Sequence, residues 1–227
     1  MKKFSLFIVG FFWAGMSIAG LEPKGMIVIE PEALLWPNAI VPYQIDDAMP
    51  LTQQAEILKA MTLWEAETVV RFVRITPEHL NPDSDYVLFQ PNVGTRCSSS
   101  VGRQGGVQVV DLASRCHTLK VAHELGHLIG LWHEQARLDR DKYIKVAWEN
   151  IDNAHYHNFK KRAGEGQNQG SYDYDSIMHY SETAFSQNEK PTLIPRMLGV
   201  QIGQRTHLSA GDIASVNALY AKELKQE

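Results

Sequence analysis

Three histidines and one glutamate in a single short stretch are the residues of this chain best suited to chemistry. The stretch is HELGHLIGLWHEQ, residues 123–135, and it contains His123, His127, His133 and Glu124. On a helix, residues four apart lie on one face, so His123 and His127 can present ring nitrogens to one metal ion. Glu124 is the next residue around the helix from His123, and its side chain can reach the same site without being a ligand.

Gly130 explains how a third histidine joins a pair on a helix. Glycine adopts a positive φ at little cost, so the chain can turn sharply and bring His133 back toward the ion. Three neutral imidazoles with an open fourth position are typical of catalytic zinc sites. Zinc lowers the pKa of its bound water to about 7, and Glu124 is placed to take the proton and pass it to a leaving amine. The stretch therefore predicts hydrolysis of an amide.

The alternative interpretation is a structural group of histidines on a buried helix. The chain contains nine histidines, so isolated pairs four residues apart are common and are more often structural. Three histidines, a glutamate and a glycine at fixed offsets should arise by chance in fewer than about one in 10,000 sequences of this composition. The full pattern favours the metal site.

Composition predicts one compact domain without a basic surface. The chain has 227 residues, 44% of them hydrophobic, with a formal net charge of -4 and a sequence pI near 6.1. A chain of this length can bury one substantial core or two small lobes. The net charge provides no field that would attract nucleic acid or an anionic membrane, so we expect neither as a partner.

The first twenty residues predict export. The segment 1–20, MKKFSLFIVGFFWAGMSIAG, has two lysines, an apolar run and small residues near its end, as a signal peptide does. The alternative is an uncleaved membrane anchor, because the apolar run is near the lower limit for spanning a bilayer. No second apolar run of that length follows. We therefore expect a secreted or periplasmic protein with no stable membrane association.

Cys97 and Cys116 are the two cysteines of the chain. Thiols of exported proteins are usually oxidised, so one disulfide between them is expected, worth about 3 kcal/mol in the loop-entropy model. The alternative, a thiolate that binds zinc or blocks the site, would need a free cysteine.

Hydrophobic periodicity predicts both strands and helices. A helix is expected within residues 52–72, with Thr52 as its N-cap and with Ala55, Leu58, Met61 and Trp64 on one face. Strands are expected at 40–45, 86–90 and 106–112, a helix at about 119–131 that ends near Gly130, irregular structure to about 186, and a last helix within 208–224. Ser209 and Asp212 have the spacing of a capping box for this last helix.

Two motifs resemble one known family. HELGHLIGLWHE matches the metzincin pattern, and Glu134 directly after the third histidine is similar to the astacins in particular. YDYDSIMHY, residues 172–180, resembles the astacin Met-turn. The resemblance implies that Met178 lies under the metal and that Tyr180 is an additional, displaceable zinc ligand. It also implies that Tyr180 then donates a hydrogen bond to the tetrahedral oxyanion, a reasonable role for a phenol beside developing negative charge.

The resemblance extends over nearly all of the chain after the leader and implies its fold. The implied fold is α+β, a metzincin (zincin-like) catalytic domain with two lobes around one catalytic Zn2+. The upper lobe holds a twisted mixed sheet and the zinc helix, and the irregular lower lobe includes the C-terminal helix. The expected division is a signal peptide at 1–20, a short pro or lead segment at 21–27, and the catalytic domain at 28–227.

The resemblance also suggests how a substrate is bound. Family members often prefer an acidic residue just after the scissile bond, and Arg196 falls where the basic side chain that recognises it would lie. The strand within GGVQVVDL is expected at the sheet edge, where an extended peptide forms main-chain hydrogen bonds. Glu134 would anchor a new amino terminus. The family's second disulfide has no cysteines here, and the pro-segment is too short for the usual aspartate switch.

These observations lead to one main hypothesis and two alternatives. The main hypothesis is a monomeric zinc endopeptidase acting on proteins or peptides, with Glu124 as general base. The first alternative is a zinc-containing binding protein or inhibitor without turnover, although a decayed site usually loses its base. The second is a zinc hydrolase acting on a non-protein amide, such as cell-wall peptide.

Overall fold

The computed structural model describes residues 24–29, 34–76, 78, 84–221 and 224. The expected signal peptide at 1–20 lies outside the described residues, so its presence and the processing of residues 21–27 stay predictions. Within the described ranges, no helix is both long enough and apolar enough to cross a membrane.

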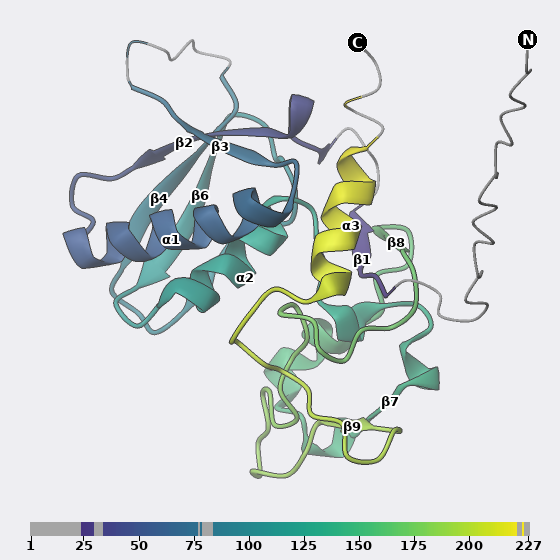
Figure 1. Ribbon diagram of the computed structural model, residues 1–227. Helices are drawn as coiled ribbons and strands as arrows, with labels where there is room; N and C mark the ends of the chain where they lie inside the picture. Colours follow the sequence, from purple (N-terminus) through teal and green to yellow (C-terminus); the bar gives the residue numbers. More distant parts are fainter. Residues whose placement is uncertain (1–23, 30–33, 77, 79–83, 222–223, 225–227) are drawn as a thin grey trace, which may run out of the picture.

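A five-stranded mixed sheet forms the upper part of the molecule (Figure 1), with strand order β3-β2-β4-β6-β5. The strands β2, β3, β4 and β6 pair in parallel, and the short β5 pairs antiparallel to β6. The three strands expected from periodicity are confirmed as β2 (Ile40–Ile45), β4 (Tyr86–Asn92) and β6 (Val107–Ala113). The strands β3 (Arg71–Arg74) and β5 (Cys97–Ser98) were not predicted.

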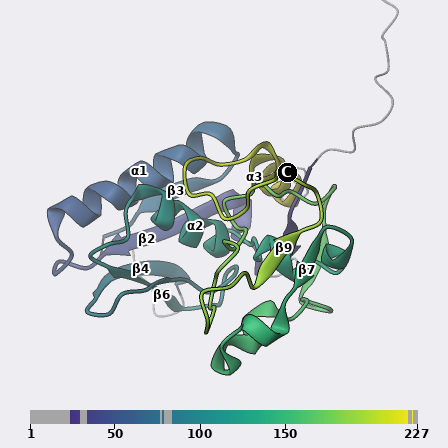
Figure 2. The ribbon, with the colours of Figure 1, turned by 90° about the horizontal axis from the view of Figure 1, so that it is seen from below.

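Two helices, α1 (Leu51–Glu67) and α2 (Thr118–Leu128), lie on one face of this sheet, as the view from below shows (Figure 2). Alternate residues of β2 and β4 are buried toward them, which is the period of two that a half-covered sheet requires. The larger hydrophobic core lies between the sheet and these helices. It includes Val41, Tyr43, Val87, Phe89, Val110, Leu112, Ile57, Met61, Trp64, Val121, Leu125 and Leu128.

The prediction for α1 was right about where the helix starts, to within one residue, and wrong in three details. Its N-cap is Pro50 and not Thr52, and its buried face includes Ile57 and Trp64, whereas Ala55 and Leu58 are exposed. The helix also ends at Glu67, because the residues that follow it enter β3 and pair with β2. The helix therefore ends before its hydrophobic periodicity does, because the following residues pair in the sheet.

The expected disulfide is confirmed between Cys97 and Cys116. It joins β5 to the loop just before α2 and leaves no free cysteine among the described residues. The covalent link therefore fixes the edge of the sheet beside the helix that carries His123 and His127.

The lower lobe has little regular structure, as expected. It holds a second hydrophobic cluster of Ile144, Ile151, Phe159, Tyr172, Leu193 and Ile202. Its regular elements are short. They are the 3-10 helices η4 (Glu134–Ala136), η5 (Arg140–Lys142), η6 (Trp148–Asn150) and η7 (Asn153–Phe159), and the paired strands β7 (Ile144–Val146) and β9 (Leu193–Pro195).

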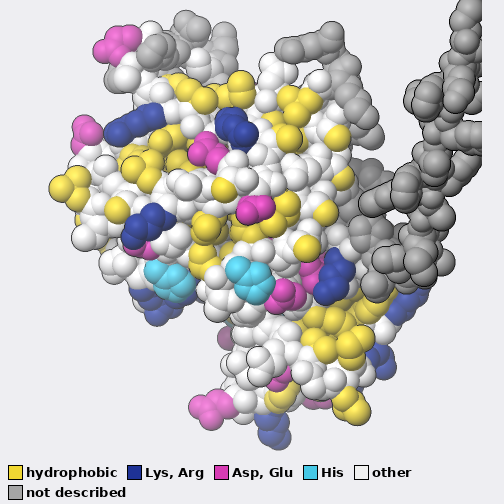
Figure 3. Space-filling view, in the orientation of Figure 1, with side chains coloured by type: hydrophobic (Ala, Val, Ile, Leu, Met, Phe, Trp, Pro, Cys, Tyr) yellow, Lys and Arg dark blue, Asp and Glu magenta, His cyan; other side chains and the backbone are white. Residues whose placement is uncertain are grey.

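The last helix, α3 (Ala210–Tyr220), and strand β1 (Ile27–Ile29) join the two lobes (Figure 1). The predicted capping box of Ser209 and Asp212 is confirmed. The side chains of α3 that point inward belong to the larger core, and β1 pairs with β8 (Gly166–Asn168). A short 3-10 helix, η2 (Pro37–Ala39), precedes β2. On the face drawn in Figure 3, basic and acidic side chains are interspersed with hydrophobic ones.

Candidate metal centre

The three histidines of the opening stretch meet at one point. The Nε2 atom of His133 lies 3.2 Å from Nε2 of His123 and 3.0 Å from Nε2 of His127. His123 and His127 project from α2, and Gly130, with φ +105°, turns the chain so that His133 joins them. The expected turn at Gly130 is therefore present, and all three ring nitrogens can address a single ion.

Backbone carbonyls fix the orientation of the two helical imidazoles. Nδ1 of His123 lies 2.8 Å from the carbonyl oxygen of Ile177, and Nδ1 of His127 lies 2.8 Å from that of Leu131. A ring that donates from Nδ1 keeps its lone pair on Nε2, which is the state a metal ligand needs. Burial lowers the pKa of both rings, and that of His127 to about 4, so neither carries a proton that would compete with a cation.

This set of donors fits zinc. Zinc binds imidazole nitrogen at about 2.0–2.1 Å, which places the nitrogens of a tetrahedral site about 3.3 Å apart. The Nε2 separations of 3.0 and 3.2 Å are close to that value. Without a cation, three neutral lone pairs directed at one point would repel one another. The His123, His127 and His133 cluster is therefore suited to one zinc ion with a fourth position open.

Met178 packs directly under α2, where a glycine makes room for it. A Cβ atom at Gly126 would lie 2.5 Å from the Met178 sulfur, closer than packing allows. Met178 is fully buried. The glycine between the two helical histidines therefore lets the Met-turn approach the helix that carries them, and the position of Met178 under a metal ion stays a prediction.

Asp212 has a second role that its sequence pattern does not reveal. Besides capping α3, its Oδ1 accepts a hydrogen bond from Ser176 Oγ at 2.7 Å and its Oδ2 accepts one from the backbone amide of Ile177 at 3.0 Å. The carbonyl of Ile177 in turn orients His123. The last helix thus holds the turn that positions a metal ligand.

Glu124 lies beside the histidines in a poorly hydrated position. Its side chain is 8% exposed, and the backbone amide of Ser99 donates a hydrogen bond to it. Burial raises the pKa of Glu124 to about 7, although Arg205 and the Ser99 amide lower it. A carboxylate with a pKa near neutrality is suited to accept and return a proton.

Tyr180 faces the same centre from the lower lobe. Its ring lies 4.3 Å from the ring of His133, centroid to centroid. Its backbone amide donates to Oε1 of Gln135 at 3.1 Å, which fixes the chain next to the histidines. Burial raises the pKa of Tyr180 to about 12, so the phenol keeps its proton and can donate it in a hydrogen bond.

A cleft of about 520 Å³ runs over the histidines between the lobes. The prediction that the strand within GGVQVVDL, now β6, forms the edge of the sheet was wrong. The strand β5 pairs with part of β6 and is the last strand of the sheet on this side. Sequence patterns missed β5 because a strand of two residues has no period. The cleft is lined by Arg96, Cys97, Ser98, Ser99, His123, Glu124, His127, His133, Ala154, His155, His157, Asn158, Tyr180 and Phe185.

Two arginines differ in their relation to this centre. Arg196 is exposed, its Nε donates to the carbonyl of Asp141 at 2.8 Å, and it is not among the residues that line the cleft. Arg205, which sequence reasoning missed, lines a hollow together with His123 and Glu124. Its charge lowers the pKa of Glu124. No periodicity or motif distinguishes Arg205 from a solvated arginine.

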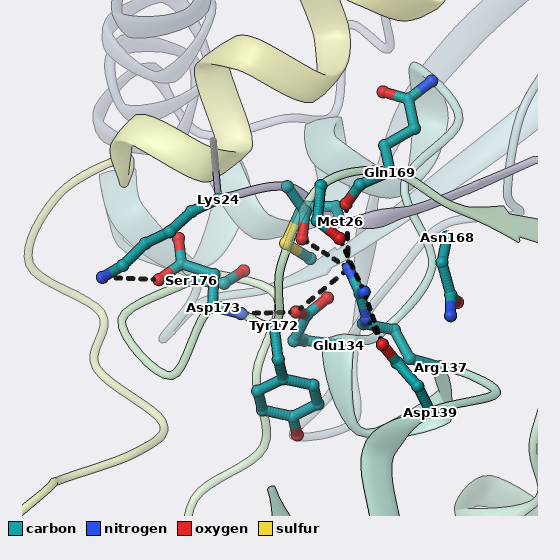
Figure 4. A network of polar contacts seen from close by, with 12 residues as sticks. Lys24, Met26, Glu134, Arg137, Asp139, Asn168, Gln169, Tyr172, Asp173 and Ser176 are labelled. Carbon is teal, nitrogen blue, oxygen red and sulfur yellow. Dashed lines mark hydrogen bonds and ion pairs between the residues drawn. The ribbon is translucent and has the colours of Figure 1, made fainter. Parts of the chain in front are cut away.

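Behind the centre, Glu134 belongs to a buried polar network (Figure 4). Its Oε1 accepts from the backbone amide of Asp173 at 2.7 Å and lies 3.7 Å from Nη1 of Arg137. Its Oε2 is buried without a hydrogen-bond partner among the described residues. Arg137 donates to the carbonyls of Gly25, Gln169 and Gly170 and to the carboxylate of Asp139.

The same network holds residues of the expected lead segment. Lys24 forms an ion pair of 3.5 Å with Asp173 (Figure 4), and Gly25 donates to the carbonyl of Ser171 at 3.0 Å. The backbone amide of Met26 donates to Oγ of Ser215 in α3 at 2.7 Å. Gly25 and Met26 are thus buried in the body of the protein, and the exposed Lys24 is tied to it by the ion pair with Asp173.

The arrangement defines a class of protein. Three neutral imidazoles aimed at one point, a carboxylate of raised pKa beside them and a phenol opposite are the parts of a zinc hydrolase that activates water.

Comparison with known proteins gives the family. Residues 28–221 match the model of the Astacin peptidase family. The chain is 40% identical to zinc metalloproteinase nas-14 of Caenorhabditis elegans over 82% of its own length and 37% of that protein. It is 41% identical to tolloid-like protein 2 of Mus musculus over 82% of its length and 19% of that protein. The chain therefore corresponds to much less than the full length of these relatives.

Solved structures agree. High choriolytic enzyme 1, a hatching enzyme zinc-protease from the medaka Oryzias latipes, superposes with a TM-score of 0.73 and 34% identity, covering 84% of this chain and 96% of that one. Myroilysin, at 19% identity and a TM-score of 0.61, shares the fold and covers 86% of this chain and 98% of that one. The chain belongs to the astacin family of zinc metalloproteinases, and its α+β metzincin fold is confirmed.

Proposed function

We propose that this protein is a zinc endopeptidase that hydrolyses peptide bonds in proteins or peptides, with His123, His127 and His133 as zinc ligands. The observation that supports this most directly is the convergence of three Nε2 atoms within a cleft bordered by a sheet edge. Such an edge can bind an extended peptide through its main chain whatever the side chains are. A peptide bond is the amide that this binding would bring to the centre.

Each residue of the centre has a distinct task in the proposed reaction. Zinc supplies a Lewis acid for the scissile carbonyl and a more acidic water. Glu124 takes a proton from the attacking water and later delivers it to the leaving amine nitrogen. Tyr180, whose phenol stays protonated, moves away from His133 and donates a hydrogen bond to the oxygen that gains negative charge.

Cleavage of an unbiased peptide library tests this proposal. The purified chain beginning near residue 24 should cut peptides, and a zinc chelator should abolish the cuts, which mass spectrometry would locate. A protein that holds one zinc but cuts no peptide would favour the binding-protein alternative. Cleavage of cell-wall amides with intact peptides would favour the non-protein hydrolase.

Tyr180→Phe should lower kcat by about 10–100-fold while KM changes little. The hydroxyl would donate a hydrogen bond where negative charge develops. Loss of one such donor typically lowers kcat by about 10²–10³-fold, and the loss is smaller when other groups still stabilise the oxyanion. Zinc content should stay near one per chain, as measured by metal analysis. A variant with unchanged kcat would remove Tyr180 from the proposed mechanism.

An acidic residue after the scissile bond would need a cation near the centre. The notion that Arg196 provides it stays a hypothesis, and its exposed position outside the cleft gives it little support. Arg205 is the stronger candidate because it lines the hollow beside Glu124 and His123. Among the described residues, only its Nη1 donates hydrogen bonds, to the carbonyls of His179 and Gln204. Its other nitrogens remain available for a carboxylate.

The two arginines can be separated by one comparison. Arg205→Ala is expected to reduce the ratio of kcat/KM for Asp over Ala after the scissile bond by about tenfold or more, because an ion pair is lost at a partly desolvated site. Arg196→Ala should leave this ratio unchanged. Matched peptides differing at that residue would give the ratio, and the reverse pattern would reinstate Arg196.

The remaining predictions concern the whole protein and not its centre. We propose that residues 1–20 direct export to a secreted or periplasmic location and that the mature protein is a monomer. The role of Glu134 as an anchor for a new amino terminus is likewise a proposal. It is supported by the Oε2 atom, which has no hydrogen-bond partner among the described residues, and by Gly25, whose carbonyl accepts from the neighbouring Arg137.

A further inference from the structure

A second hollow opens beside the catalytic cleft. Its volume is about 420 Å³, and it shares Ser99 with the cleft over the histidines. Ser99 is also the residue whose backbone amide donates to Glu124. The described residues that line this hollow are Ile29, Leu34, Ser99, Ser100, Val101, Gln104, Trp132 and Glu165.

The hollow and Arg205 lie toward opposite ends of the edge segment at residues 95–101. The hollow with Arg205 is lined by Thr95 and Cys97, whereas the second hollow is lined by residues from Ser99 to Val101. The catalytic cleft lies between them, at Cys97 to Ser99. An extended peptide along β5 would therefore pass Arg205, the histidines and the second hollow in turn.

The walls of the hollow are apolar and held in place. Four of its lining side chains are hydrophobic, among them Trp132, whose Nε1 donates to the carbonyl of Glu165 at 2.9 Å. The guanidinium carbon of Arg162 lies 4.3 Å from the centre of the Trp132 ring system, a cation–π contact. A fixed indole is a suitable wall for a side-chain pocket because little entropy is lost when a ligand packs on it.

Among its described lining residues, the hollow has no lysine or arginine that could pair with an acidic side chain. Among the described lining residues, Glu165 is the one that carries a charge, and its carboxylate accepts from Arg162 at 3.1 Å. The amide of Gln104 is occupied with the carbonyl of Val101 at 2.8 Å. The remaining interaction that the hollow provides is burial of apolar surface, which favours a large hydrophobic side chain.

We propose that this hollow is a specificity pocket for a large apolar side chain that lies two or three residues before the scissile bond. Side chains of an extended peptide alternate in direction at about 3.3 Å per residue, so one residue in this range would face the hollow while the reacting carbonyl lies at the histidines. The proposal rests on the proposed peptidase function and on Arg205 marking the side after the bond.

Matched fluorogenic peptides that carry Phe, Ala or Asp at these positions test the pocket. The wild-type chain should cleave the Phe peptide with a kcat/KM about tenfold or more above the Ala peptide, the range expected for filling an apolar pocket. The Asp peptide should be the poorest. Equal rates for the three peptides, or a preference for Phe on the opposite side of the bond, would overturn the proposal.

Two variants show whether this hollow is the source of the preference. Ser100→Trp fills it and should reduce the Phe to Ala ratio to about one while cleavage of the Ala peptide persists. Glu165→Lys should raise the rate for the Asp peptide several-fold. Val93→Trp, at a fully exposed position, is the control and should keep the wild-type ratio.

Failure of this proposal is distinguishable from failure of the proposed function. If no peptide is cleaved, the peptidase assignment itself is wrong, and if Glu124→Gln cleaves as well as the wild type, Glu124 is not the general base. If cleavage depends on Glu124 but is indifferent to the residue facing the hollow, the specificity pocket alone is wrong.

Discussion

Replacing Glu124 by Gln is expected to lower kcat for peptide cleavage by about 10²–10⁴-fold, the range of a lost general base. The amide has nearly the same shape as the carboxyl group but cannot accept the proton of the attacking water. The histidines are untouched, and their Nδ1 contacts to Ile177 and Leu131 should persist. Initial-rate assays at saturating peptide concentration would measure kcat. Metal analysis should still find one zinc per chain.

Glu67→Gln is the control that separates the loss of the general base from a general loss of one negative charge. It alters an exposed carboxyl at the end of α1 that does not belong to the metal centre, and it should keep wild-type activity. Substantial turnover by the Glu124 variant with zinc bound would exclude Glu124 as the base.

The largest effect on stability is expected for Arg137→Met. Arg137 is 1% exposed and is bonded to three backbone carbonyls and to Asp139. Methionine retains much of the volume but leaves those carbonyls and the buried carboxyl of Glu134 without their cation. Breaking a buried pair in this way costs about 3–5 kcal/mol in the free energy of unfolding. Urea unfolding followed by fluorescence would measure the loss.

Lys161→Met provides the comparison, since it removes a cation that pairs with Asp141 at the surface. Exposed pairs contribute about 0–1 kcal/mol, so the midpoint should shift little. A second substitution, Glu134→Gln in the Arg137→Met chain, should recover part of the stability because it removes the uncompensated carboxyl. Equal losses for Arg137→Met and Lys161→Met would show that the buried network contributes nothing.

Local patterns were sufficient to predict the helix that carries His123 and His127 and the turn at Gly130. Both depend on the spacing of residues within one or two turns, and the structure places them as expected. The capping box of α3 was predictable for the same reason, whereas the disulfide was predictable because the chain has only two cysteines. The motif around Met178 located the Met-turn but not what holds it.

Contacts between distant segments could not be predicted. The edge position of β5 depends on how strands far apart in sequence are ordered in the sheet, and a strand of two residues carries no period. The buried face of α1 was misplaced because Leu58 fits an amphipathic pattern as well as Ile57 does. Arg205 is one of many basic residues until the fold brings it beside Glu124.

The network around Arg137 illustrates the same limit in a different way. Its guanidinium joins carbonyls from residue 25 and from residues 169–170, which a sequence cannot bring together without the fold. Only burial shows that this arginine is not a solvated charge.

The contact between α3 and the Met-turn also bears on when, during synthesis, the protein becomes able to cut. The segment from His123 to His133 leaves the ribosome well before α3, whose Asp212 holds Ser176 and Ile177 in place. An emerging chain therefore carries its metal ligands before the support beneath them exists. In a zinc metalloproteinase, this order delays the finished cleft until the last helix has also left the ribosome and folded against the Met-turn.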